Sequence, residues 1–138
     1  MKVLVVYEST LGRTKAMAHA ICEGVVASGV ECSAIEARDY TGLEGFCALA
    51  IGSSTRMKRP LPRVRQILSE ISGMNGMPSA SFGSYGWSGE APEEIAKILV
   101  ERGAVMIAAP LRCKDYPNEE ALASCRELGR RLAQACDR

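Results

Sequence analysis

The opening stretch of the sequence has the residue types that could bind a phosphate. An apolar run at residues 3–6 predicts a buried strand, and a helical pattern begins near residue 14. Between them, hydroxyl groups and a glycine can turn the chain toward the helix, whose first N–H groups and positive dipole end attract anions. The stretch therefore predicts a phosphate site. Its residues are Ser9, Thr10, Leu11, Gly12, Arg13 and Thr14.

Two further loops with chemical content directly follow predicted strands. The strand predicted at residues 46–51 leads into serine, threonine and basic residues, and the strand at residues 78–82 leads into a loop with three glycines and two large aromatics. Because ligands of parallel sheets bind beyond the carboxyl ends of the strands, we expect the three loops to form one site. The candidates in these two loops are Ser53, Ser54, Thr55, Arg56, Met57, Gly83, Ser84, Tyr85, Gly86 and Trp87.

Strand and helix patterns alternate along the whole chain. Further strands are predicted at residues 30–37 and 105–109, with residues 111–117 as a loop, and apolar residues at helical spacing fill the segments between strands. Five strands alternating with helices predict an α/β fold, a doubly wound five-stranded parallel sheet. At 138 residues, with no repeat or linker, the chain is expected to form a single domain, residues 1–138.

Composition excludes several classes of function. The net charge is +1, so no global field attracts nucleic acid, and no apolar run approaches the roughly 20 residues of a membrane span. No signal-peptide pattern is visible, so we expect a cytoplasmic protein. The six cysteines form no C-x-x-C pair and the chain has one histidine, which predicts reduced, mostly buried thiols and no metal site. No catalytic residue is predicted.

The same stretches resemble a known family. Y-E-S-T-L-G-R-T-K-A-M-A resembles the phosphate-binding opening of flavodoxins. A-I-G-S-S-T-R and S-F-G-S-Y-G-W-S-G-E-A together resemble the flavodoxin-like domain of the flavodiiron proteins, also called A-type flavoproteins. The closing stretch P-L-R-C-K-D-Y-P-N-E-E-A continues the likeness, which covers essentially the whole chain. The resemblance implies a flavodoxin-like sheet with strand order 2-1-3-4-5.

The resemblance also implies non-covalently bound FMN. Residues 9–14 would wrap the FMN phosphate with backbone N–H groups, helped by the hydroxyl groups of Ser9 and Thr14. Residues 53–57 would lie along the ribityl chain and one edge of the flavin ring, and residues 83–87 would pass the other edge. The glycines would let the backbone approach the flavin closely.

Two departures from the family pattern affect this site. The second loop lacks the proline and the aromatic that flavodoxins commonly have, so Met57 or the aliphatic stem of Arg56 would have to cover that face of the ring. Arg13 stands where a small polar residue is usual. In addition, Lys58 and Arg59 form a basic cluster with Arg56, which would favour a reduced, anionic flavin or dock an acidic redox partner.

The hypothesis that follows is an FMN-binding electron-transfer protein that shuttles electrons between redox partners, favoured over an enzyme with its own substrate turnover. One alternative is a regulatory or interaction module of this fold with weak or lost flavin binding. Another is a small NAD(P)H-dependent flavin or quinone reductase. A di-iron reductase is excluded for this chain by itself, because that metal centre needs several histidines in a separate domain. The electron donor, the acceptor and the oligomeric state stay open.

Overall fold

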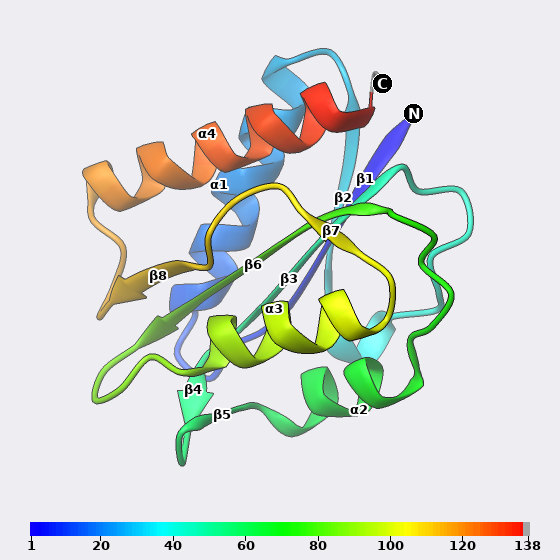
Figure 1. Ribbon diagram of the computed structural model, residues 1–138. Helices are drawn as coiled ribbons and strands as arrows, with labels where there is room; N and C mark the ends of the chain where they lie inside the picture. The colour runs from blue at the N-terminus through cyan, green and yellow to red at the C-terminus, as the bar shows by residue number, and fades with distance from the viewer. Residues whose placement is uncertain (137–138) are drawn as a thin grey trace.

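A computed structural model describes residues 1–136, in which helices cover both faces of one parallel sheet (Figure 1). Each strand of this sheet runs parallel to the strands it pairs with. In order across the sheet, the strands are β2 (Glu31–Glu36), β1 (Lys2–Glu8), β3 (Ala48–Ser53), β6 (Pro78–Tyr85) and then both β7 (Val105–Met106) and β8 (Leu111–Lys114), which pair with β6 one after the other. This arrangement confirms the doubly wound α/β fold and the order 2-1-3-4-5.

The helices divide between the two faces of the sheet (Figure 1). One face packs against α1 (Arg13–Ala27) and α4 (Glu119–Cys136), and the other packs against α2 (Pro62–Glu70) and α3 (Ala91–Glu101). A single 3-10 turn, η1 (Ala37–Asp39), follows β2. Within residues 1–136, no helix has both the length and the apolar character needed to cross a membrane.

The central strand β1 contributes side chains to both cores, because successive side chains of a strand point to opposite faces of the sheet. Val3 and Val5 point into the cluster beneath α1 and α4, whereas Leu4 and Val6 point into the cluster beneath α2 and α3. All four side chains are buried. The continuous apolar run at residues 3–6 is therefore explained, because a parallel strand covered on both faces has no polar side.

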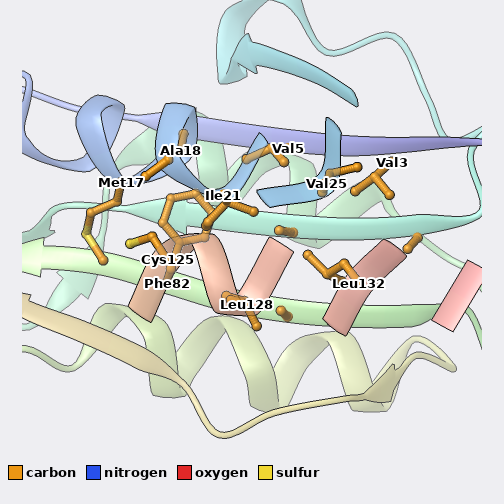
Figure 2. Close-up of a cluster of buried hydrophobic side chains, with 14 of the residues drawn as sticks. Val3, Val5, Met17, Ala18, Ile21, Val25, Phe82, Cys125, Leu128 and Leu132 are labelled. Atoms are coloured by element: carbon orange, nitrogen blue, oxygen red, sulfur yellow. The ribbon is translucent and has the colours of Figure 1, made fainter. Parts of the chain in front are cut away.

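Two glycines allow α1 and α4 to pack with their backbones almost in contact. A Cβ at Gly24 would collide with the backbone oxygen of Arg126, and a Cβ at Gly129 would collide with the backbone oxygen of Ile21. Figure 2 shows Ile21 and Val25 of α1 beside Leu128 and Leu132 of α4 in the same buried cluster. The pattern of larger apolar residues places the two helices on one face, and the glycines determine how closely they approach.

The last predicted strand differs from the observed one. Residues 105–109 were expected to form one strand, but β7 ends at Met106, and β8 covers residues 111–114, which were expected to be a loop. Pro110 lies between the two strands and has no N–H group to donate to a sheet ladder, which accounts for the interruption. The fourth strand is also longer than expected, since β6 continues through Gly83 and Ser84 to Tyr85.

The expectation of reduced thiols is wrong for four of the six cysteines. Cys22 of α1 is bonded to Cys32 of β2, and Cys47 is bonded to Cys136 at the end of α4. Their Cα atoms lie 5.5 Å and 5.4 Å apart, within the range that a disulfide spans. Sequence spacing could not reveal this, because the second pair is 89 residues apart. The argument from thiols to a reducing compartment loses its support, and the cytoplasmic location stays a prediction.

The two remaining cysteines should resist alkylation in the folded protein. Burial raises the pKa of Cys125 to about 12, and burial together with the charge of Asp115 raises the pKa of Cys113, so little thiolate forms near pH 8. We expect intact-mass measurements after iodoacetamide treatment to show no label on the native protein, two labels after denaturation alone, and six after denaturation with reduction. Six labels without reductant would contradict both disulfides.

Candidate functional site

Three loops meet where β1, β3 and β6 end side by side. The strands are in register up to these ends, with Glu8 opposite Ser53 and Gly52 opposite Phe82. A Cβ at Gly52 would collide with the Phe82 ring, and a Cβ at Gly83 would collide with the backbone oxygen of Ser53. Glycine at these two positions therefore lets the strands and their loops approach closely. The structure brings all three predicted loops to one edge of the sheet.

The first loop, residues 9–12, leads directly into α1. Gly12 has φ +82° and occupies the N-cap position without any side-chain cap on the helix. Its own N–H group donates to Ser9 Oγ at 3.0 Å, which tightens the turn. The first turn of α1 contains no acidic residue. The first N–H groups of the helix are thus left for an external acceptor, and the helix dipole favours an anion there.

One buried hydroxyl group connects all three loops. Thr14 is fully buried, and its Oγ1 lies 2.8 Å from Ser84 Oγ and 3.2 Å from Ser54 Oγ. The backbone N–H of Ser84 also donates to Thr14 Oγ1, at 3.3 Å. The Thr14 side chain therefore joins α1 to the loop after β3 and to the end of β6, from which the third loop continues. This role was not part of the sequence-based expectation, which assigned the hydroxyl to the phosphate.

The second loop is a small antiparallel hairpin rather than an irregular segment. Its strands are β4 (Thr55–Arg56) and β5 (Arg59–Pro60), and both turn residues, Met57 and Lys58, have positive φ, at 51° and 66°. Two such residues in succession are typical of the tight turn whose twist matches a hairpin. Met57 is 91% exposed at the tip.

The hydroxyl groups of this hairpin hold its base. Ser53 is fully buried, and its Oγ donates to the carbonyl of Ser54 and accepts from the N–H of Leu61, both at 2.8 Å. Thr55 Oγ1 accepts from the N–H of Ala91 at the start of α3. The side chains of Ser53 and Thr55 are therefore engaged within the protein, and the exposed surface of the hairpin is formed by its tip.

The third loop follows β6 and presents the only tryptophan of the chain. Trp87 is 97% exposed, whereas Ser84 at the base of the loop is 2% exposed. A Cβ at Gly89 would lie 2.8 Å from the Tyr85 ring, so the loop folds tightly over that aromatic. Hydrogen bonding from Ser88, only partly offset by desolvation, lowers the pKa of Glu90, which keeps this carboxylate ionised at the start of α3.

Around the three loops, in the part of the chain that the structure describes, some charged side chains form ion pairs and several positive ones remain unpaired. Arg59 pairs with Glu94 at 3.2 Å, and Arg112 pairs with Glu93 at 3.3 Å. Three exposed cations make no ion pair within residues 1–136, which leaves the rim of the site net positive. They are Arg56, Lys58 and Lys114.

Sequence reasoning missed three residues that shape the site. Glu8 Oε1 accepts from the N–H of Val64 and so holds the start of α2. Asp115, with φ +61°, follows β8, donates its N–H to the carbonyl of Tyr85 at 2.7 Å and faces Arg13 across the site. Tyr116 beside it is 64% exposed. The sequence signal for Asp115 and Tyr116 is the K-D-Y-P turn. It is typical of an ordinary loop when no strand is predicted before it.

Replacing Thr14 with valine should loosen the contact between the loops. The change keeps the shape of the side chain but leaves the partner groups of Ser54 and Ser84 unpaired, so we expect the free energy of unfolding to fall by about 2 kcal/mol. Amide hydrogen exchange at residues 84–87 should also accelerate.

The exposed Thr10 supplies a matched control, because Thr10→Val lies outside the network and should change stability by less than about 0.5 kcal/mol. Unchanged exchange at residues 84–87 in Thr14→Val would show that another contact holds the third loop.

Comparison with known proteins agrees with the fold described above. The flavodoxin family model matches residues 5–129. The chain is 33% identical over 143 residues to the anaerobic nitric oxide reductase flavorubredoxin of Aeromonas hydrophila, covering 96% of this chain and 29% of that protein. The chain thus spans about a third or less of the length of such curated relatives. The nitric oxide reductase activity in that name belongs to the longer protein.

Two solved structures have the same fold over nearly the whole chain. A flavodoxin from the domain Archaea superposes with a TM-score of 0.95 and 37% identity and covers 100% of both chains. The rubredoxin:oxygen oxidoreductase of Desulfovibrio gigas superposes with a TM-score of 0.92 and 26% identity, covering 99% of this chain and 36% of that one.

Proposed function

The chain belongs to the flavodoxin family and is homologous to the flavodoxin domain of flavodiiron proteins, and on this premise we propose that it is an electron carrier that uses FMN. FMN is the cofactor of this family. The observation that carries the proposal is the uncapped start of α1, held by Thr14 against the two other loops of the site.

The residues present fit FMN. The free N–H groups at the start of α1 suit its phosphate, because they are unpaired donors at the positive end of the helix dipole. Met57 and Trp87 are large apolar side chains on the second and third loops, exposed to solvent and able to cover a ring system. When bound, FMN supplies the redox chemistry, while this chain binds and orients it.

The first test is the absorption spectrum of the desalted protein, followed by titration of the apoprotein with FMN. Because Trp87 is the only tryptophan, quenching of its fluorescence reports on this site alone. We expect visible flavin bands, and we expect Trp87→Ala, titrated by flavin fluorescence because it has no tryptophan, to bind FMN about tenfold more weakly through the loss of ring stacking.

Val100→Ala, at an exposed position on α3 away from the loops, is the control and should bind FMN normally. A colourless protein that does not take up FMN would overturn the proposal and favour an interaction module of this fold. Steady-state oxidation of NAD(P)H by the purified protein would instead favour a flavin or quinone reductase.

The rim of the site suits an acidic redox partner. Arg56 and Lys58 of the hairpin and Lys114 at the end of β8 are exposed cations, and Met57 and Trp87 expose apolar surface on the second and third loops. Apolar contact at the centre with charge at the edge is the usual division of a transient interface, in which the charges steer encounter. Arg59, which the sequence grouped with this cluster, is paired with Glu94 and contributes less.

The sign of this field can be measured without knowing the partner. The reduced flavoprotein is mixed with ferricyanide, an anionic oxidant, or with a tris-phenanthroline cobalt complex, a cationic one. We expect added salt to slow oxidation by ferricyanide and to accelerate oxidation by the cobalt complex, because screening removes attraction in the first case and repulsion in the second.

Lys58→Glu should slow the ferricyanide reaction several-fold, whereas Lys97→Glu, an identical charge change on the exposed side of α3, should have little effect. Equal salt dependence for the two oxidants would contradict a positive rim.

A further inference from the structure

Arg13 is a cation at a position where it does not help its own helix. It is the first residue of α1, and a positive charge at a helix N-terminus is opposed by the helix dipole. No acidic residue in the first turn offsets it. The placement therefore costs stability unless an anion outside the helix interacts with it.

The side chain of Arg13 lies across the site rather than in solvent. It is 30% exposed, and its Nη1 lies 3.9 Å from Oδ1 of Asp115, the residue after β8. A Cβ at Gly86 would be 3.7 Å from the same Nη1, so the guanidinium lies against the third loop. Arg13 thus spans from the helix start to the loop that is proposed to border the flavin.

Asp115 does not satisfy this guanidinium. A separation of 3.9 Å exceeds hydrogen-bond distance, and the Asp115 side chain is 65% exposed, so the pair is a weak surface ion pair. The other N–H donors of Arg13 make no hydrogen bond within residues 1–136. A partly buried guanidinium with free donors, on the residue that begins α1, is suited to a phosphate bound between the helix start and the third loop.

We propose that the Arg13 side chain contacts the phosphate of FMN and makes the site select phosphorylated flavin over riboflavin, with Asp115 competing for the same guanidinium. The inference rests on the proposed function, since it assumes that FMN binds here. Backbone N–H groups bind the phosphate as dipoles, and Arg13 adds a full charge. Asp115 opposes the phosphate by repulsion and by holding Arg13, and it therefore lowers the affinity for FMN.

The backbone of Asp115 is held independently of its carboxylate. Its N–H donates to the carbonyl of Tyr85, and the Cys113 thiol lies 4.0 Å from its carbonyl oxygen. Asp115→Asn should therefore leave the turn in place while removing the charge. The substitution isolates the competition for Arg13 from the architecture of the loop.

The test is a set of dissociation constants for FMN and for riboflavin, measured by flavin fluorescence at low salt on apoprotein. Arg13→Gln should weaken FMN about tenfold, the loss of one charge-assisted hydrogen bond, and leave riboflavin unchanged. Asp115→Asn should tighten FMN several-fold, and this gain should be clearly smaller in the double variant with Arg13→Gln, where only the relief of direct repulsion remains. Lys15→Gln, an exposed cation in the same helical turn, is the matched control and should change FMN affinity less than threefold.

The outcomes are distinct. Wild-type protein that binds neither flavin would overturn the proposed function and this inference with it. Wild-type protein that binds FMN, with Arg13→Gln weakening both flavins equally or neither, would overturn the role of Arg13 alone. If Arg13→Gln fails to fold, Asp115→Asn decides, because unchanged or weaker FMN binding in that variant contradicts the competition.

Discussion

The site depends on the hydroxyl group of Thr14, which is buried where three chain segments meet. Its oxygen lies within hydrogen-bond distance of Ser54 Oγ and Ser84 Oγ and accepts from the N–H of Ser84. Buried polar groups are costly unless they are paired, so each of the three loops is held in place by the other two. The helix start can remain uncapped because this contact, and not a capping side chain, fixes where the loop lies.

The two ends of the sheet carry different features. Near the amino ends of the strands, Cys32 lies opposite Val3 in the register and Cys47 donates its N–H to Lys2, so both disulfides tie β2 and β3 to helices at that end. The carboxyl ends hold the exposed side chains of Met57 and Trp87 and the free N–H groups at the start of α1. Cross-links far from the loops can stabilise the fold without restricting the approach of a cofactor or a partner.

Positive charge lies both on the exposed surface around the site and in a partly buried position inside it, and each has its own proposed consequence. Arg56, Lys58 and Lys114 are exposed and act through a screened field, which affects encounter with a partner. Arg13, the first residue of α1, has a partly buried side chain, whose charge is screened less and acts on what is bound. The same sign of charge thus serves association at the rim and selectivity inside it.

The sequence by itself determined the fold class and the three loops. Local signals sufficed, because the two-sided apolar run of residues 3–6, the helical stripes and the glycine-rich turns each depend on neighbours a few residues away. Tertiary structure alone decided the Cys47–Cys136 bond, the pairing of β8 with β6, and the position of Asp115 opposite Arg13. Each of these requires segments far apart in the chain to meet, and pairing across such separations depends on the packed sheet rather than on any local pattern.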